Sequence, residues 1–228
     1  MIATMTALTL LIAPLQSPGQ RVASKMITAA KPGYYQANAE YLVFGKHKLA
    51  VVVNPILKKK AQSMHVEWVA QTEKAFKDLG KPFAAWEHEV SMHAYYQTPG
   101  LLTIGISTYD YSGGAHPNHW IEFMTFGAAA GKSRQLALKD FFLPGFDCAT
   151  HVSSLVIKKL KAEEGADWVK NGEVKKMDAK MLQRFTPDKG GMVWFFNPYE
   201  VGPYAAGDFE VKLTLKELGP KFRAALLK

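Results

Sequence analysis

Residues 85–111 read AWEHEVSMHAYYQTPGLLTIGISTYDY, the stretch with the clearest local structure in the chain. Apolar side chains alternate with polar ones along both halves of this stretch. The alternating apolar residues are Val90, Met92, Ala94, Leu102, Ile104 and Ile106. A period of two predicts β-strands, so we expect a hairpin. The two apolar sets share one face only if the loop has an odd number of residues, which predicts a loop of residues 98–100.

This register places Met92 opposite Ile106, and His88 opposite Asp110, on the apolar face of the hairpin. A carboxylate that orients an imidazole is a common catalytic arrangement. It is equally a common way to satisfy a half-buried histidine. Because no serine or cysteine is evidently placed as a nucleophile, we favour the structural role. The alternative is a small cell-wall hydrolase that uses His88, Asp110 and His116.

Outside the hairpin, strand and helix patterns mix without a regular βαβ rhythm. The expected strands lie in residues 34–54 (two short strands around Gly45), 119–126, 192–200 and 208–215. One helix is expected from the stripe of His65, Trp68, Val69, Thr72, Phe76 and Leu79, and another begins near Cys148. Residues 127–135 read as a turn. The pattern predicts an α+β fold, with mainly antiparallel sheets packed against a few helices in two small subdomains.

The first residues, MIATMTALTLLIAPLQSPGQ, are an apolar uncharged run followed by small and helix-breaking residues. Such a run is typical of a secretory signal, so we expect an exported protein, periplasmic or extracellular. The expected organisation is a signal-like segment and basic lead in residues 1–33, an N-terminal domain in residues 34–126 and a C-terminal domain in residues 127–228.

The chain has 228 residues and a formal net charge of +8, which is concentrated near its start. Residues 21–60 hold eight basic residues against Glu40 alone, a net charge of +7. A basic region of this kind suits peripheral contact with an anionic surface of the cell envelope, although a solvated face is the more ordinary explanation. We expect no nucleic-acid partner.

Cys148 is the one cysteine of the chain, so no intrachain disulfide can form. It lies just inside the expected start of a helix, a position that can lower the pKa of a thiol. A lone cysteine in an amphipathic helix is more often a small buried apolar residue, and we expect burial here.

Two segments rich in glycine and proline, SGGAHPN at 112–118 and NPYEVGPYAAG at 197–207, are candidate ligand contacts. Tyrosine and histidine on turns of fixed shape make good contact residues, and the polar face of the hairpin also carries tyrosines. The candidate ligand-binding residues are Tyr109, Tyr111, His116, Asn118, Tyr199 and Tyr204. The residues expected to shape the turns are Gly113, Gly114, Pro117, Gly202, Pro203 and Gly207.

Other motifs point away from cofactor and metal chemistry. The sequence GAAAGKS has three residues between its glycines, whereas a phosphate-binding P-loop needs four. His116, His119 and Glu122 recur at metal-like spacing, but positions three apart on a strand point to opposite faces. We therefore expect neither a metal nor a cofactor.

The blocks STYDYSGGAHPN, LALKDFF and VWFFNPYEVGPYAAGDFEVKLTLKEL resemble a pair of bacterial extracytoplasmic domains of unknown function. The two domains occur together in the receptor region of the anti-sigma factor RsiV. The first also precedes the catalytic domain of PdaC-type peptidoglycan deacetylases. The resemblance covers roughly residues 34–220.

The resemblance implies an α+β protein that faces the envelope and has no catalytic machinery of its own. We expect a binding protein for a cell-wall glycan or for a wall-acting protein such as a lysozyme-like hydrolase. In RsiV this region binds lysozyme. The charge of +8 argues against that partner here, because lysozymes are themselves basic. Anti-sigma signalling is not expected to carry over.

Overall fold

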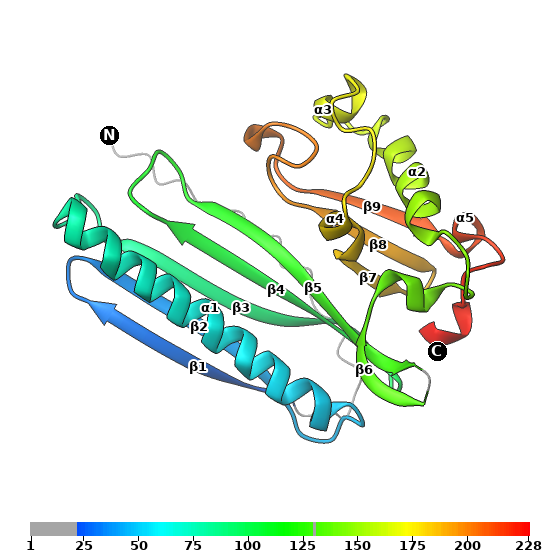
Figure 1. The fold of residues 1–228 in the computed structure, drawn as a ribbon, viewed down its shortest axis with the longest axis horizontal. Coiled ribbons are helices and arrows are strands. Elements are labelled where there is room, and N and C mark those ends of the chain that lie inside the picture. Colours follow the sequence, from blue (N-terminus) through cyan, green and yellow to red (C-terminus); the bar gives the residue numbers. More distant parts are fainter. Residues whose placement is uncertain (1–21, 130) are drawn as a thin grey trace.

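The computed structural model describes residues 22–129 and 131–228, which form two β-sheets with their helices (Figure 1). The first sheet has six strands in the order β1-β2-β3-β4-β5-β6, and the second has three in the order β7-β8-β9. Among the described strands, β2 and β3 are the one parallel pair. The expected α+β class with mainly antiparallel sheets is confirmed.

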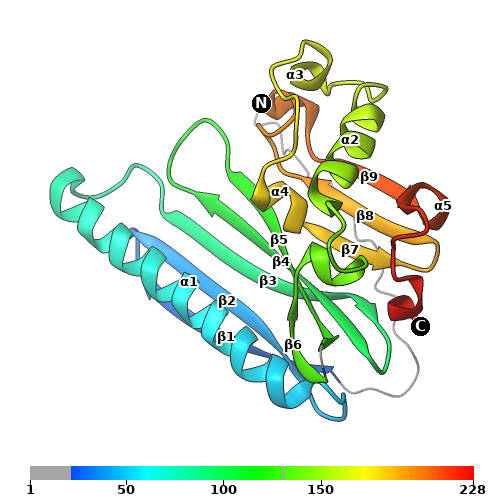
Figure 2. The same cartoon turned by 45° about the vertical axis from the view of Figure 1, so that its right-hand side comes forward.

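The first unit consists of the six-stranded sheet and one long helix. Its elements are β1 (Val22–Lys31), β2 (Tyr35–Phe44), α1 (Ala50–Leu79), β3 (Trp86–Gln97), β4 (Leu101–Tyr111), β5 (Asn118–Ala129) and β6 (Lys132–Leu136). Helix α1 connects the parallel strands β2 and β3. It packs on β1, β2 and β3, and it does not extend over the outer edge of β5 (Figures 1 and 2).

Helix α1 begins much earlier than the sequence pattern predicted. We expected a strand at the end of residues 34–54 because residues 51–53 are three consecutive valines. That prediction was wrong. The buried positions of the helix are Val53, Leu57, Ala61, His65, Thr72 and Phe76. This helical period already begins at Val53, and the apolar core beneath it outweighs the β-propensity of valine. Leu79, expected on the buried stripe, is 71% exposed.

A side-chain amide fixes the connection from β2 to α1. The Phe44 amide donates a 2.9 Å hydrogen bond to Oδ1 of Asn54, and Nδ2 of Asn54 donates a 3.0 Å bond to the Phe44 carbonyl. The Asn54 carboxamide thus satisfies both main-chain groups of the last residue of β2. This local closure allows the chain to turn from strand to helix within a few residues.

Strands β3 and β4 form the expected hairpin with the expected register. Met92 lies opposite Ile106, and His88 lies opposite Asp110. Met92 and Ile106 are almost completely buried, which confirms the assignment of the apolar face. Alternation along two adjacent strands was sufficient information because it leaves one pairing in which both apolar sets face the core.

The turn of this hairpin differs from the prediction. The main-chain groups of Thr98 and Leu101 bond to each other, at 2.8 and 3.4 Å, so the loop has two residues. Residues 98–100 separate the two strands, as predicted, but the prediction missed that Thr98 also pairs with Leu101. The register still holds because β3 contains a β-bulge that leaves Tyr95 as an extra residue. A two-residue loop alone would place the apolar residues of one strand opposite the polar residues of the other. The extra residue of the bulge brings the two apolar sets back onto the same face.

Two segments that the sequence pattern predicted to be connections form β-strands in the structure. The basic lead of residues 21–33 contains β1, which pairs with β2 along its whole length. The expected turn at 127–135 is a hairpin in which β5 extends to Ala129 and β6 pairs with it. The first sheet therefore continues to Leu136, beyond residue 126, where we expected the first domain to end.

The second unit follows β6 and contains the small sheet and four short helices. Its elements are α2 (Cys148–Leu160), α3 (Asp167–Lys170), α4 (Ala179–Gln183), β7 (Phe185–Asp188), β8 (Gly191–Phe196), β9 (Phe209–Thr214) and α5 (Leu215–Leu218). Single 3₁₀ turns occupy Leu138–Phe141, Tyr204–Ala206 and Ala224–Leu227. Helix α2 begins where expected, and the Asp147 carboxylate caps it by accepting a 3.1 Å bond from the Thr150 amide.

Cys148, at the first position of α2, is 7% exposed and packs in the core of the second unit. Burial raises the pKa of its thiol. The expected burial is confirmed, and the thiol lacks the electropositive, partly exposed surroundings of a reactive cysteine.

The second unit covers part of the tyrosine-bearing face of the hairpin. The ring of Phe195 lies 4.7 Å from that of Phe123 and 5.8 Å from that of Tyr95, between centroids. Near the C-terminus the Tyr96 hydroxyl donates a 2.5 Å bond to the Leu227 carbonyl. The second sheet of the same chain therefore covers part of this polar face.

The signal-like segment at the start of the chain lies outside the described residues. Within residues 22–129 and 131–228, none of the helices has both the length and the apolar composition that a bilayer crossing requires.

Candidate binding groove

The two glycine- and proline-rich segments pack against each other. The imidazole of His116 stacks on the ring of Tyr204, with centroids 4.0 Å apart and planes inclined by 20°. The Tyr204 hydroxyl donates a 2.9 Å hydrogen bond to the carbonyl of Pro117. Residues 112–118 of the first unit and 197–207 of the second therefore form one pair of docked turns. Two of the six candidate ligand contacts face each other.

Backbone geometry explains why some positions in the docked turns are glycines. Gly113 has a φ of 80°, in the left-handed region that favours glycine. A Cβ on Gly202 would lie 2.1 Å from the carbonyl oxygen of Gly165, which excludes any side chain there. Gly114 is exposed and has no such constraint.

The other candidate contacts surround the docked turns. Tyr109 and Tyr111 are half-buried on β4, and Asn118 is exposed at the start of β5. Burial raises the pKa of the Tyr109 hydroxyl. Tyr199 is 54% exposed and has a φ of 66°, an uncommon conformation for a bulky residue. Its ring lies 5.5 Å from that of Tyr204, so an exposed aromatic surface continues from the docked turns.

His119 connects the two units beside these turns. Its Nε2 lies 3.0 and 3.2 Å from the two carboxylate oxygens of Asp208. That hydrogen bond raises the pKa of His119. Glu122 instead pairs with Lys60 of α1 at 2.8 Å. Among the described residues no group of three His, Cys, Asp or Glu side chains could hold a metal ion.

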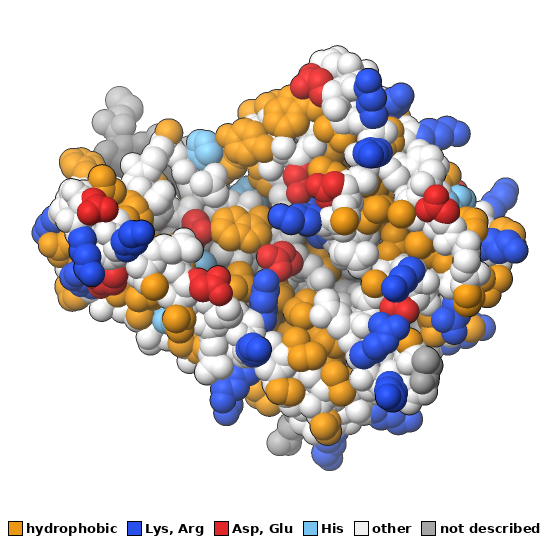
Figure 3. Space-filling model, viewed as in Figure 1, with side chains coloured by type: hydrophobic (Ala, Val, Ile, Leu, Met, Phe, Trp, Pro, Cys, Tyr) orange, Lys and Arg blue, Asp and Glu red, His pale blue; other side chains and the backbone are white. Residues whose placement is uncertain are grey.

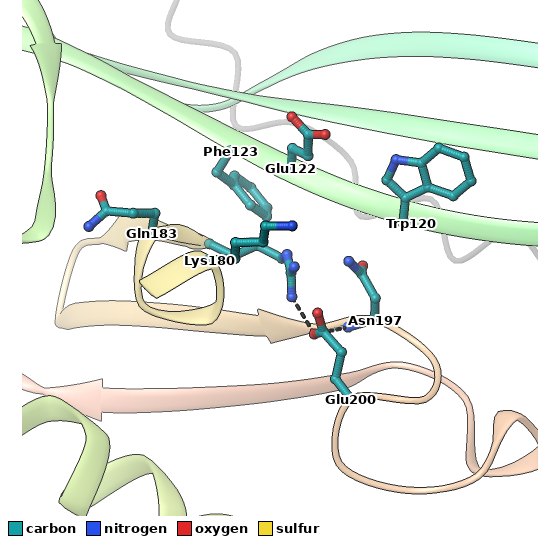
Figure 4. A pocket seen from close by; sticks show the side chains of 8 residues that line it. Trp120, Glu122, Phe123, Lys180, Gln183, Asn197 and Glu200 are labelled. Atoms are coloured by element: carbon teal, nitrogen blue, oxygen red, sulfur yellow. Dashed lines mark hydrogen bonds and ion pairs between the residues drawn. The ribbon is translucent and has the colours of Figure 1, made fainter. Parts of the chain in front are cut away.

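A groove of about 470 Å³ opens between β5 and the second unit (Figure 4). Its lining residues come from β5, from the region of α4 and from the start of the 197–207 turn. They are Trp120, Glu122, Phe123, Lys180, Gln183, Arg184, Asn197 and Glu200. Figure 3 shows acidic and basic side chains gathered around a hollow between α1 and the second unit.

An ion pair forms part of the groove wall. The guanidinium of Arg184, itself 8% exposed, pairs with the carboxylate of Glu200 and also donates a 3.3 Å bond to the Phe195 carbonyl. The same carboxylate accepts a 2.8 Å bond from the Asn197 amide. The pair is therefore held on several sides, and it fixes the start of the 197–207 turn against the second sheet.

The groove follows an unpaired strand edge. Strand β6 pairs with β5 from Thr125 onward, so none of the described strands lies beside the outer edge of residues 118–124. Asn197 occupies one position on this edge. Its Oδ1 accepts a 2.8 Å bond from the Ile121 amide, and its Nδ2 lies 3.4 Å from the Ile121 carbonyl.

One positive charge of the groove has no partner. Lys180 forms no ion pair or hydrogen bond with any residue in the described part of the chain, whereas Glu122 and Glu200 are each paired with a cation. The four charged side chains that line the groove sum to zero, and Lys180 is left over because Glu122 pairs with Lys60 outside the lining. Lys180 can therefore pair with an acidic group of a ligand.

His88 and Asp110 form the predicted pair, with Nδ1 and Oδ1 2.5 Å apart. The imidazole stacks on Trp68 of α1, and its Nε2 is buried without a hydrogen-bond partner in the described residues. His116 contacts Tyr204 instead, and no described contact joins it to the other two. The three residues of the hydrolase hypothesis therefore do not converge on a common reacting atom.

The comparisons with known proteins match a different family model to each half of the chain. Residues 29–119 match the family model described as deacetylase PdaC. Residues 139–216 match the model described as a protein of unknown function, DUF3298. These matches confirm the predicted tandem, and they indicate an uncharacterised family of extracytoplasmic type. A search of curated proteins gave no match.

Two crystal structures of DUF3298 family proteins have the same fold over most of the chain. A member from Bacteroides fragilis NCTC 9343 is 16% identical, with a TM-score of 0.60 over 89% of this chain and 93% of its own. A protein from Pseudomonas aeruginosa PAO1 is 18% identical, with a TM-score of 0.63 over 92% of this chain and 96% of its own. At such identities the similarity concerns the fold alone.

None of the six candidate contacts lines the groove. Of the residues that do, the sequence analysis considered Glu122, as a possible metal ligand, but proposed none of them as a ligand contact. A partial signal existed, because Asn197 and Glu200 flank Tyr199 in the NPYE sequence that drew attention to this turn. Lys180, Gln183 and Arg184 lie in a polar stretch without a recognisable motif. Packing of the second unit on β5 brings them into the site.

Proposed function

We propose, from the premise that this chain carries a PdaC-type domain followed by a DUF3298 domain, that it is an exported, non-catalytic binding protein of the cell envelope. Its ligand is a component of the cell wall, either the glycan or a protein associated with it. The binding surface is the groove together with the exposed aromatic surface around Tyr199.

One observation carries this proposal: the groove draws its walls from both units. A site shared by two packed domains is a common location for ligand binding. Trp120 offers an apolar ring, Lys180 a charge that no described residue pairs, and Gln183 an amide nitrogen, whereas the Asn197 amide is already bonded to Ile121. This set can orient a ligand, and it contains no nucleophile paired with a base.

The charge of the chain supports an envelope location. The net charge is +8, and the described lysines of residues 22–60 belong to β1, to the β2–α1 connection and to the first half of α1. Lys31 pairs with Glu73 and Lys60 with Glu122. Lys25, Lys46, Lys48, Lys58 and Lys59 are exposed, and these side chains suit weak contact with anionic wall polymers.

Retention on purified, insoluble peptidoglycan tests the proposal. We expect the parent protein to be retained at low salt and Trp120→Ala with Lys180→Ala to be retained at least fivefold less. Phe83→Ala with Lys77→Ala is the matched control, because it removes a fully exposed aromatic ring and a lysine from the far end of α1. Loss of retention in the control alone, or no retention together with no partner in a screen of wall-associated proteins, would contradict it.

The hydrolase alternative is decided by turnover. The buried, short His88–Asp110 bond is the observation in its favour. We expect peptidoglycan fragments to stay intact after long incubation with the protein. Release of soluble sugars or peptides that disappears in His88→Phe would replace the binding function with an enzymatic one.

A further inference from the structure

We infer that the C-terminal end of α1 binds the surface of a lipid bilayer that carries anionic headgroups. The contact surface, the α1 tip, consists of Leu79, Phe83 and three lysines that flank them, Lys74, Lys77 and Lys81. This inference goes beyond the proposed function, because it concerns a second partner and a surface that shares no residue with the groove.

Two large apolar side chains of the α1 tip are exposed to solvent. Phe83, in the loop that follows α1, is completely exposed, at 109%, and Leu79, the last residue of α1, is 71% exposed. Neither side chain belongs to any of the apolar clusters that the described residues form. Because water disfavours neighbouring apolar side chains at a surface, their exposure indicates a contact that the folded chain does not itself supply.

The position of Leu79 on the helix explains why it is uncovered. Phe76 is the last buried residue of α1, and its ring packs against those of Tyr34 and Trp86, with centroids 5.5 and 4.7 Å away. Leu79 follows three residues later, on the same helical stripe but beyond these contacts. The apolar stripe of α1 therefore continues past the last position that the core buries.

Positive charge flanks the two apolar side chains. Lys74, Lys77 and Lys81 are exposed, and none of them forms an ion pair or hydrogen bond with a residue that the structure describes. Asp78 is the one acidic residue among residues 74–83, which leaves this segment with a net charge of +2. Figure 3 shows apolar side chains beside basic ones at this end of the molecule.

The turn between β1 and β2 lies beside the α1 tip and does not neutralise it. A Cβ on Gly33 would lie 3.3 Å from Cε of Lys81, so this turn and the tip share one end of the first unit. Lys31, just before the turn, binds Glu73 at 3.0 Å, so the acidic residue that precedes Asp78 on α1 is already paired. The lysines of the tip are therefore available to an anionic partner.

The combination of apolar and basic side chains favours a bilayer over other anionic surfaces. Phe83 and Leu79 can be buried at the boundary between headgroups and acyl chains, while the lysine ammonium groups stay at the level of the headgroup phosphates. Each lysine near an anionic bilayer adds electrostatic attraction. A hydrated wall polymer would use the lysines and leave both apolar side chains in water, and for this reason we favour the bilayer.

Sedimentation of the full chain with lipid vesicles tests this inference. The probe is a vesicle of phosphatidylcholine with about one third phosphatidylglycerol, compared with a vesicle of phosphatidylcholine alone. We expect Leu79→Ala with Phe83→Ala to weaken binding to the anionic vesicles about tenfold, because the buried apolar area is lost. Lys77→Ala with Lys81→Ala should weaken it about fivefold and reduce the preference for anionic vesicles. Every variant carries the same first 21 residues, so differences among variants report on the tip.

Leu215→Ala with Lys216→Ala is the matched control. It removes an exposed leucine and an exposed lysine from α5, at the opposite end of the molecule (Figure 1), and should leave vesicle binding unchanged. Phe83→Trp gives a direct readout of insertion, because lipids with brominated acyl chains quench a tryptophan that enters the bilayer. We expect more quenching in Phe83→Trp than in the parent or in Leu215→Trp. All the changed side chains are exposed, so the urea midpoints of the variants should match that of the parent.

The outcomes separate this inference from the proposed function. Equal vesicle binding by the parent and the Leu79 and Phe83 variant would overturn the inference, as would an equal loss in the α5 control. A loss in the lysine variant alone, without added quenching in Phe83→Trp, would show contact with any anionic polymer and would also overturn it. Purified peptidoglycan contains no lipid, so a tip variant that loses vesicle binding should keep its retention there. Loss of both by a folded tip variant would overturn the assignment of the tip to lipid.

Discussion

Two pairs of histidines lie in contrasting surroundings in this molecule. His65 and His88 are both buried in the first unit, with exposed fractions of 6% and 3%. His116 and His119 are exposed at the junction of the two units. Burial lowers the pKa of His65, and the neighbouring His88 lowers it further. The hydrogen bond to Asp208 raises the pKa of His119.

The comparison shows that residue type does not set the pH response of this protein. The buried imidazole of His65 has no partner and favours its neutral form, whereas the exposed imidazole of His119 beside Asp208 favours its charged form. Acid should therefore destabilise the first unit and strengthen the contact between the units.

The largest effect is expected from Asp110→Ala. This change leaves both ring nitrogens of the buried His88 without a partner, at a cost of about 2 kcal/mol in the free energy of unfolding. Urea unfolding followed by tryptophan fluorescence measures it. Adding His88→Phe should recover part of the loss, because a phenyl ring keeps the stacking on Trp68 and has no polar atoms. Equal stability of Asp110→Ala and the parent would show that this pair contributes nothing.

His65→Leu should change the acid limb of the stability curve. A folded-state pKa below the unfolded value means that stability is fully present above about pH 6.5 and is lost as the pH falls below it. Leucine removes that loss, so the variant should gain stability relative to the parent as the pH falls from 7 to 5. Parallel stability curves for the two proteins across this range would contradict the buried, neutral assignment.

Tyr204→Phe tests the docked turns without removing their ring contact. The change deletes one hydrogen bond, to the Pro117 carbonyl, and should cost about 1 kcal/mol. Tyr111→Phe serves as control, because the Tyr111 hydroxyl has no hydrogen bond within the described residues. The two variants would behave alike if the turns were held by stacking alone.

The smallest effect is expected from Asp208→Asn, since both partners of this pair are about half exposed and screened by solvent. A raised folded-state pKa gives a contribution that is present below about pH 6.5 and is lost as the pH rises through the folded value. The cost should stay below about 1 kcal/mol, appear only on the acid side and shrink in salt. An NMR titration of His119 should show its pKa fall in the variant; no change would exclude Asp208 as the cause.

The hairpin and its His88–Asp110 register could be predicted because both depend on alternation within one short stretch. The β-bulge at Tyr95 could not, since an extra residue in a strand leaves no mark in a pattern of polar and apolar residues. The bulge offsets the effect of the tight turn on the register, so the predicted pairing of β3 with β4 is correct. Helix α1 was found only in its second half, because the valines near its start have strong β-propensity and its burial comes from the sheet beneath it.

The candidate contacts show the same limit at the level of function. His116 and Tyr204 have the chemistry of ligand contacts, yet each meets the other, and that pairing spans two units far apart in sequence. Conversely, Lys180 belongs to no recognisable motif, and it becomes a groove residue only because α4 lies beside β5.

The sequence by itself determined the α+β class, the tandem of two domains, the central hairpin and the burial of Cys148. These features follow from local periodicity, from helix-capping residues and from blocks of resemblance. Tertiary structure alone decided where main-chain and charged groups are left without partners. Lys180 lies in the groove without an ionic partner among the described residues because of what packs beside it, and a sequence pattern records no such neighbour.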